Sequence, residues 1–130
     1  MGLRIYLQPI RMSFFGKNQT LGIKSITPLD ANALLQRDSS VVVLDVRTSD
    51  EYRGETGHLP HALLIPLQEL ERRADELAKL KDRTILVYCR SGHRSLQAGK
   101  ILSVRGFRAI NLEGGILQWR KNLLPIANED

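Results

Sequence analysis

Short apolar runs alternate with amphipathic segments along most of the chain. The runs at 41–44 and 84–88 are almost entirely apolar, which is typical of central parallel strands that are covered on both faces. Shorter runs at 25–26, 62–65 and 108–110 predict three further strands. Because helical patterns separate these runs, the sequence predicts an α/β fold with a mainly parallel sheet of about five strands and helices on both faces.

Helix signals fill the intervals between the predicted strands. Thr27 followed by Pro28 resembles an N-cap with proline at the first helical position. Ser49 is a candidate cap for a short helix that holds Glu51 and Tyr52. Three further helices are predicted: one at 66–78, one that follows the loop ending at residue 95 and stops at Gly106, and one around Ile116 and Trp119.

Composition places the chain among single globular domains. It has 130 residues, of which 42% are hydrophobic and 25% are charged, and this suffices for one domain with its own core. We divide it into a basic, flexible N-terminal extension (1–22), a folded domain (23–125) and a C-terminal tail (126–130). The sequence has no uninterrupted apolar span of transmembrane length. Its single cysteine excludes an internal disulfide, so nothing marks it as a disulfide-stapled secreted domain, and we expect it in the cytoplasm. We also expect a monomer.

The positive charge is concentrated in the first 24 residues. Arg4, Arg11, Lys17 and Lys24 lie there without an acid, so they carry four of the five net positive charges of the chain. The folded domain is nearly neutral, and we expect neither a nucleic-acid partner nor a membrane partner. We expect the extension to be dispensable for folding and chemistry, and Met12 is a possible internal start.

The cysteine, Cys89, ends the apolar run at 84–88 and precedes small, polar and basic residues. A helix pattern begins soon afterwards, so this cysteine is expected between a strand and a helix N-terminus, where ligands bind in open α/β sheets. Loop N–H groups, the helix N-terminus and two arginines would lower the thiol pKa, and the thiolate is the reactive form. A lone cysteine is more often a buried apolar residue, but the cationic loop favours a nucleophile. The predicted substrate-binding loop consists of Arg90, Ser91, Gly92, His93, Arg94 and Ser95.

Two further polar residues, Asp45 and Arg47, follow the predicted central strand at 41–44. A carboxylate at the carboxyl end of that strand is expected near the cysteine loop. We expect Asp45 to hold loop backbone rather than to take part directly in catalysis. Arg47 and Glu51 are four residues apart and could form an ion pair, which at this spacing is often worth only a few tenths of a kcal/mol.

Five motifs of the chain resemble those of the rhodanese-like domains and occur in the expected order. They are Leu44-Asp45-Val46-Arg47, Glu51-Tyr52, Gly57-His58-Leu59-Pro60, Cys89-Arg90-Ser91-Gly92-His93-Arg94-Ser95, and Leu112-Glu113-Gly114-Gly115 with Trp119. The resemblance covers about residues 23–125. His61 stands where the family usually has glycine, and the spacer at 53–56 is longer than usual. Both departures concern a rim loop rather than the cysteine segment.

The resemblance implies a sulfurtransferase in which Cys89 carries a persulfide and which needs no cofactor. A donor such as thiosulfate would load the cysteine, and cyanide, a thiol or a protein sulfur acceptor would unload it. Arg90, expected at the rim, and Arg94, expected nearer to the hydrogen bonds of the loop, would attract an anionic donor. His58 and His61 lack a clustered third ligand, so the sequence predicts no metal site.

Two other functions are compatible with the same residues. A related phosphatase family shares the fold but carries Cys-x5-Arg, whereas four residues separate Cys89 from Arg94. The shorter loop favours a single sulfur atom over a phosphate. The domain could also serve as a sulfur carrier or a regulatory binding module, because a fold alone does not establish an activity.

Overall fold

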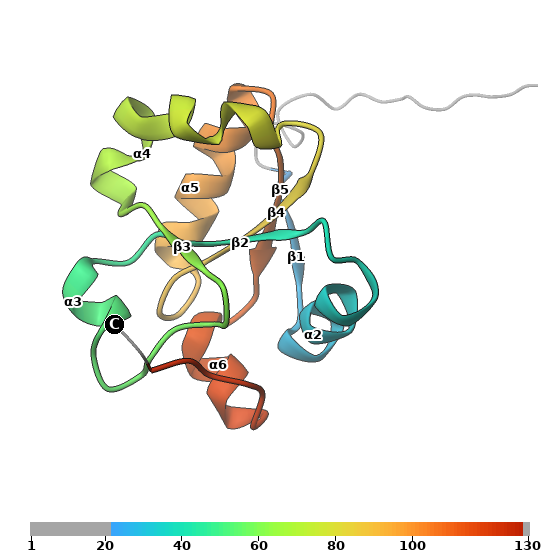
Figure 1. The fold of residues 1–130 in the computed structure, drawn as a ribbon, viewed down its shortest axis with the longest axis vertical. Helices are drawn as coiled ribbons and strands as arrows, with labels where there is room; N and C mark the ends of the chain where they lie inside the picture. The colour runs from blue at the N-terminus through green and yellow to red at the C-terminus, as the bar shows by residue number, and fades with distance from the viewer. Residues whose placement is uncertain (1–21, 129–130) are drawn as a thin grey trace, which may run out of the picture.

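The computed structural model describes residues 22–128, and Figure 1 shows a central sheet with helices on both of its faces. All neighbouring strands are parallel, and their order is β1-β5-β4-β2-β3. The predicted parallel α/β fold is therefore confirmed. The strands are β1 (Lys24–Ile26), β2 (Val42–Asp45), β3 (Leu63–Leu64), β4 (Thr84–Tyr88) and β5 (Arg108–Leu112).

The helices form two layers around the sheet. They are α2 (Pro28–Arg37), α3 (Ser49–Tyr52), α4 (Leu67–Arg73), the 3₁₀ helix η1 (Ala74–Leu80), α5 (His93–Val104) and α6 (Gly115–Lys121). The helices α2 and α6 cover one face of the sheet, and α4, η1 and α5 cover the other (Figure 1). The side chains of each layer share a buried cluster with the sheet. The chain therefore builds one apolar core on each face.

Strands β2 and β4 lie side by side in the middle of the sheet and are buried on both faces. Leu44 and Val87 contribute to the core under α5, whereas Val43 and Leu86 contribute to the core under α2 and α6. This two-sided burial explains the continuous apolar runs in the sequence. The register pairs Asp45 with Tyr88, so both strands end at the same edge of the sheet.

Local capping confirms one predicted helix start and corrects another. The Thr27 hydroxyl accepts a hydrogen bond from the Asp30 N–H at 3.2 Å and caps α2, as predicted. The cap of α3 is Thr48 and not Ser49, because the Thr48 hydroxyl accepts from the Glu51 N–H. The Glu51 carboxylate in turn accepts from the Thr48 N–H at 3.0 Å, which completes a capping box.

The single helix predicted at 66–78 is wrong in its second half. The α-helix ends at Arg73, and the chain continues as the 3₁₀ helix η1. A 3₁₀ helix has three residues per turn, so Ala74, Leu77 and Leu80 fall on one side. These three side chains are buried or half-buried, whereas Ala78, expected on the apolar face, is exposed.

Part of the predicted C-terminal tail belongs to the folded structure. Ala127 pairs with His58 through two backbone hydrogen bonds of 2.8 and 2.9 Å. Residues 1–21, which make up nearly all of the predicted N-terminal extension, lie outside the described residues. Among the helices found within 22–128, none is long and apolar enough to cross a membrane.

Candidate active site

Cys89 lies at the carboxyl end of β4, and its side chain is almost fully buried with a relative exposure of 1%. The chain then turns sharply into α5, and Gly92 is the N-cap residue with a φ of 116°. A side chain at such a φ would be strained, so glycine at this position is what permits the turn. The sequence prediction of a cysteine between a strand and a helix N-terminus is confirmed.

Polar hydrogens converge on the sulfur of Cys89. The backbone N–H groups of Gly92 and Ser95 donate to Sγ at 3.1 and 3.4 Å, and the Ser95 hydroxyl lies 3.3 Å from it. Burial raises the pKa of the thiol, but the hydrogen bonds of Ser95, Gly92 and Ser91 outweigh it, so the pKa is lowered overall. A lowered pKa increases the fraction of thiolate, which is the nucleophilic form.

The first turn of α6 holds the backbone of Cys89 and Arg90 in place. The Ile116 N–H donates to the Cys89 carbonyl at 2.9 Å, and the Leu117 N–H donates to the Arg90 carbonyl at 3.2 Å. These helix N–H groups have no partner within their own helix, so the loop carbonyls satisfy them. Gly115 lies directly against the same two carbonyls. The glycine pair before α6 therefore allows this helix to approach the loop.

The side chain of Arg94 forms hydrogen bonds with Glu51 rather than with the backbone of its own loop. Its two terminal nitrogens donate to the two carboxylate oxygens at 2.8 Å each, a bidentate arrangement. The suggested pair between Arg47 and Glu51 is therefore wrong. Arg90, Ser91 and His93 are exposed. For Arg90 this agrees with the expected position at the rim of the site. Within residues 22–128 no ion pair involves Arg90, so its charge is available to an anion.

Glu51→Gln is expected to remove the acid-sensitive part of this contact and to keep the helix cap, because a glutamine oxygen can also accept from Thr48. The bonds from Arg94 lower the pKa of Glu51 from 4.5 to about 2. Since the folded-state pKa is depressed, the stabilisation is complete above about pH 4.5 and is lost as the pH falls toward 2. Near neutral pH, we expect the free energy of unfolding of Glu51→Gln to be about 1 kcal/mol lower than that of the native protein.

Urea unfolding of both proteins at a series of pH values measures this difference. It is expected to shrink steadily below about pH 4.5. A difference that stays constant down to the acid limit of folding would show that the Arg94 contact is not the cause.

Asp45 and Arg47 form a buried pair that holds the neighbouring loop. Arg47 donates to Asp45 Oδ2 at 2.7 Å, and the two side chains are 1% and 0% exposed. Arg47 also donates to the Thr56 hydroxyl and the Gly57 carbonyl, at 2.8 Å each. Burial lowers the pKa of Arg47, but the bonds and charge of Asp45 outweigh it and raise the pKa overall. The prediction that Asp45 holds loop backbone is confirmed, because the Arg47 N–H also donates to its carboxylate.

Tyr88 joins this pair to the rest of the loop. Its hydroxyl donates to Asp45 Oδ2 at 2.7 Å and accepts from the Leu59 N–H at 3.0 Å. Burial and the adjacent carboxylate of Asp45 raise the pKa of Tyr88, so it stays a neutral donor. Neither Asp45 nor Arg47 hydrogen-bonds to the sulfur of Cys89, so both act on the surrounding frame.

Sequence analysis missed two residues of the site. Glu51 was suggested as a partner of Arg47, and its true partner, Arg94, is 43 residues away along the chain. Asn111, a buried residue near the end of β5, accepts a hydrogen bond of 2.5 Å from the Ser95 hydroxyl. A polar residue between Ile110 and Leu112, which both pack in the core, is the signal that would have singled out Asn111.

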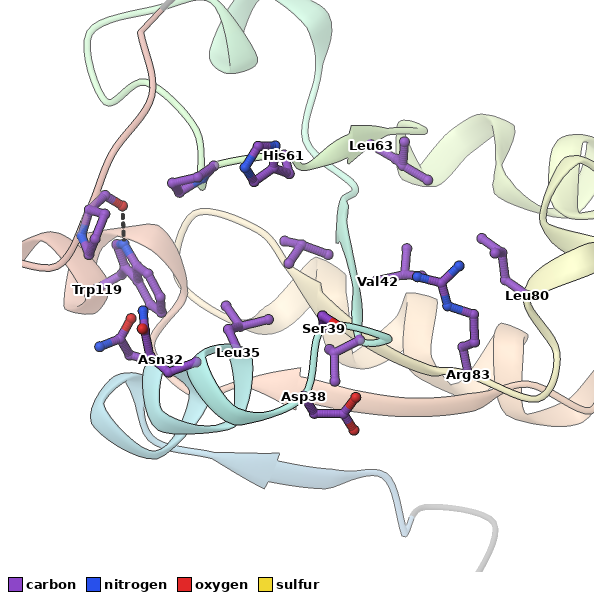
Figure 2. A pocket seen from close by; sticks show the side chains of 15 residues that line it. Asn32, Leu35, Asp38, Ser39, Val42, His61, Leu63, Leu80, Arg83 and Trp119 are labelled. Atoms are coloured by element: carbon purple, nitrogen blue, oxygen red, sulfur yellow. Dashed lines mark hydrogen bonds between the residues drawn. The ribbon is translucent and has the colours of Figure 1, made fainter.

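The structure also contains a cavity of about 540 Å³, located away from Cys89. It lies between the C-terminal half of α2 and the segment around His61, beside Val42 at the start of β2 (Figure 2). No described residue of the 89–95 loop lines it. Cys89 follows the carboxyl end of β4 and is not among the residues that line the cavity, so the cavity and the Cys89 loop are separate features. Within 22–128 there is no cluster of three acidic, histidine or cysteine side chains fit for a metal.

A family model for the rhodanese-like domain matches residues 27–122, which include every predicted motif of the site. The chain belongs to the rhodanese-like family. A sulfurtransferase of Allochromatium vinosum is 38% identical to it over 105 residues, which cover 78% of this chain and 94% of that protein. The putative sulfur carrier protein YrkF of Bacillus subtilis is 35% identical over 108 residues, which cover 80% of this chain and 56% of that protein.

A solved structure supports the assignment of this chain to the rhodanese-like family. A rhodanese-related protein from Thermoplasma volcanium superimposes with a TM-score of 0.73 at 30% identity, over 82% of this chain and 99% of that chain. Together these relatives support a transferase of the rhodanese family and general sulfur transfer as its chemistry.

Proposed function

We propose that this rhodanese-like domain is a thiosulfate sulfurtransferase that carries sulfur as a persulfide on Cys89. The supporting observation is the buried Sγ, which accepts from the backbone N–H groups of Gly92 and Ser95 and lies 3.3 Å from the Ser95 hydroxyl. Such donors stabilise a negative charge on sulfur without any movement during the reaction. The reaction needs no metal or organic cofactor, because Cys89 itself holds the transferred atom.

In the first half-reaction the Cys89 thiolate attacks the outer sulfur of thiosulfate. A sulfur–sulfur bond forms between Cys89 and that atom while the sulfur–sulfur bond of thiosulfate breaks. Sulfite leaves with the electron pair of the broken bond, and the new terminal sulfur carries a negative charge. The loop N–H groups are suited to stabilise that charge.

In the second half-reaction cyanide or a thiolate attacks the terminal sulfur of the persulfide. The bond between that sulfur and Cys89 breaks, its electron pair returns to Cys89, and thiocyanate or a new persulfide leaves. The enzyme regains its thiolate, so the two substrates react in separate steps. A single cysteine that needs no disulfide fits a reducing compartment, and we place this reaction in the cytoplasm.

A sulfur carrier is the second candidate, and the similarity to the putative sulfur carrier YrkF favours it. A carrier would load Cys89 but would release sulfur slowly to small acceptors. A phosphatase is disfavoured, because four residues and not five separate Cys89 from Arg94, and the charge of Arg94 is already paired with Glu51.

Steady-state kinetics with thiosulfate and cyanide tests the proposal. Plots of reciprocal rate against reciprocal thiosulfate concentration at several cyanide concentrations are expected to be parallel, as in a ping-pong reaction. Cys89→Ser is expected to abolish turnover. Intersecting lines, or turnover that persists in the variant, would contradict a persulfide enzyme, and loading without turnover would support the carrier.

Arg90→Ala is expected to raise the KM for thiosulfate about two- to five-fold and to leave kcat nearly unchanged, because an exposed charge attracts the donor but does not touch the reacting sulfur. Arg105→Ala is the matched control, since Arg105 is also exposed but lies at the opposite end of α5. Kinetics at low and moderate salt measures the effect. An equal KM for the two variants would show that Arg90 does not attract the donor.

A further inference from the structure

Asn111 is a buried polar side chain whose contacts lead directly to the reactive sulfur. It lies on β5 between Val87 of β4 and Ser25 of β1, and it is 3% exposed. Its Oδ1 lies 2.5 Å from the Ser95 hydroxyl, and its Nδ2 donates to the Ser25 hydroxyl at 3.1 Å. Ser95 in turn lies 3.3 Å from the sulfur of Cys89. A chain of hydrogen bonds therefore runs from Ser25 through Asn111 and Ser95 to Cys89.

The number of protons in this chain fixes its direction when Cys89 is a neutral thiol. A serine hydroxyl has one proton to donate, and an amide oxygen can only accept. The distance of 2.5 Å between Ser95 Oγ and Asn111 Oδ1 fits an O–H···O bond, so the Ser95 proton points at Asn111. The Ser95 oxygen then accepts the proton of the Cys89 thiol. Every group of the chain has a partner in this arrangement.

Ionisation of Cys89 makes the same arrangement unfavourable. The thiolate, Asn111 Oδ1 and the Gly92 carbonyl, which lies 3.2 Å from the Ser95 hydroxyl, then compete for one proton. If Ser95 donates to the sulfur, its oxygen faces an amide oxygen at 2.5 Å without a proton between them. Buried acceptors without a donor are costly. A rotation of the amide by half a turn removes this conflict, because Nδ2 then donates to Ser95.

We propose that Asn111 is a positioning residue for Cys89, and that its amide reverses when the thiol ionises so that Ser95 donates to the thiolate. Ser25 permits the reversal, because its hydroxyl can accept from Nδ2 in one orientation and donate to Oδ1 in the other. This inference rests on the proposed role of Cys89 as the nucleophile. It explains why an amide, which offers both a donor and an acceptor, occupies this buried position.

Other charges near the loop also act on Cys89 and must stay constant in a test. Arg94 interacts electrostatically with Cys89 and with Asp45. Further charged or titratable groups on the elements around the loop include Arg47, Glu51, Tyr88, Arg90, His93, Lys100, Arg108 and Glu113. None of them is changed in the experiment below, so their fields are common to every variant.

The first measurement follows the side-chain amide of Asn111 by ¹⁵N–¹H NMR in the chain of 130 residues without any sulfur donor. The Asn111 amide signals are identified by their absence in the spectrum of Asn111→Asp. The pH dependence of the rate at which iodoacetamide alkylates Cys89 gives the pKa of the thiol. The chemical shifts of the Asn111 amide are expected to change with pH with a midpoint at that pKa. Asn122, whose amide donates to the Gln118 carbonyl, serves as the control within the same spectrum. Asn111 signals that do not change at the Cys89 midpoint would overturn the inference.

The second measurement separates the relay through Ser95 from the charge of a carboxylate. Asn111→Asp offers no amide donor, so it is expected to raise the Cys89 pKa by about one unit or more in the protein with Ser95. In the Ser95→Ala background the new carboxylate at position 111 can act on Cys89 only through space. Asn111→Asp is therefore expected to raise the Cys89 pKa clearly less in that background. Equal rises in the two backgrounds would overturn the relay.

Both measurements concern the free thiol and use no sulfur donor. Failure of thiosulfate to load Cys89 would therefore refute the proposed function and leave the coupling to Asn111 measurable. Conversely, loading of Cys89 without any response of Asn111 would refute this inference alone. If Asn111→Asp fails to fold, Cys89→Ser supplies the NMR comparison, since it is expected to abolish the titration of the amide signals.

Discussion

Replacing Arg47 with methionine is expected to lower the free energy of unfolding by about 3–5 kcal/mol, because it leaves the carboxylate of Asp45 buried without its cation. Asp45 is fully buried and takes three side-chain hydrogen bonds from Arg47. The same change removes the donors to Thr56 and Gly57 and so loosens the loop beside the site. Urea unfolding followed by the fluorescence of Trp119, the single tryptophan, measures the loss.

The double variant Asp45→Asn/Arg47→Met is the control for this prediction. It removes the uncompensated charge while the Tyr88 hydroxyl keeps an acceptor at residue 45. It is expected to be more stable than Arg47→Met alone, since an unpaired buried charge costs more than a neutral polar group. Equal stabilities of the single and double variants would show that loop contacts, and not the buried charge, carry the effect.

Gly115→Ala is expected to reduce kcat for sulfur transfer at least about ten-fold by displacing the backbone at Cys89. Gly115 has a φ of 61°, and a Cβ on it would lie 2.5 Å from the Cys89 carbonyl oxygen and would also collide with the Arg90 carbonyl. Both carbonyls accept hydrogen bonds from α6, so neither can move away without losing a bond. The strain and the clash are also expected to cost about 1–3 kcal/mol of stability.

Gly106→Ala separates the backbone strain from the displaced loop. Gly106 also has a positive φ, of 91°, but a Cβ there would meet nothing closer than the end of the Lys81 side chain at 4.0 Å. We expect this variant to lose stability and to keep kcat. A similar loss of kcat in both variants would mean that general destabilisation, and not the contact of Gly115 with the loop, reduces activity.

The fold could be predicted from the sequence because its strongest signals are local or periodic. The runs that became β2 and β4 are apolar on both faces, and such runs fit only the middle of a covered sheet. Thr27 and Pro28 marked the start of α2 through bonds within four residues. The change from α4 to η1 escaped prediction, because apolar spacings of three and four residues look alike over a short segment.

The site was predictable only where its chemistry lies in one contiguous segment. Cys89 and its loop could be identified because the cysteine, the glycine turn and the helix start follow one another along the chain. The Glu51–Arg94 pair joins residues 43 positions apart, so sequence spacing instead suggested a nearby but incorrect partner, Arg47. The contact of Asn111 with Ser95 likewise depends on the register of β5, which no local pattern fixes.

The most direct measurement of the central claim is the intact mass of the protein after treatment with thiosulfate and removal of the excess. If Cys89 carries the transferred sulfur, the mass is expected to rise by one sulfur atom and to return to its starting value after cyanide. Fragment masses are expected to place the added atom on Cys89, and Cys89→Ser is expected to show no gain. An unchanged mass in the native protein, or the same gain in Cys89→Ser, would contradict sulfur transfer through Cys89.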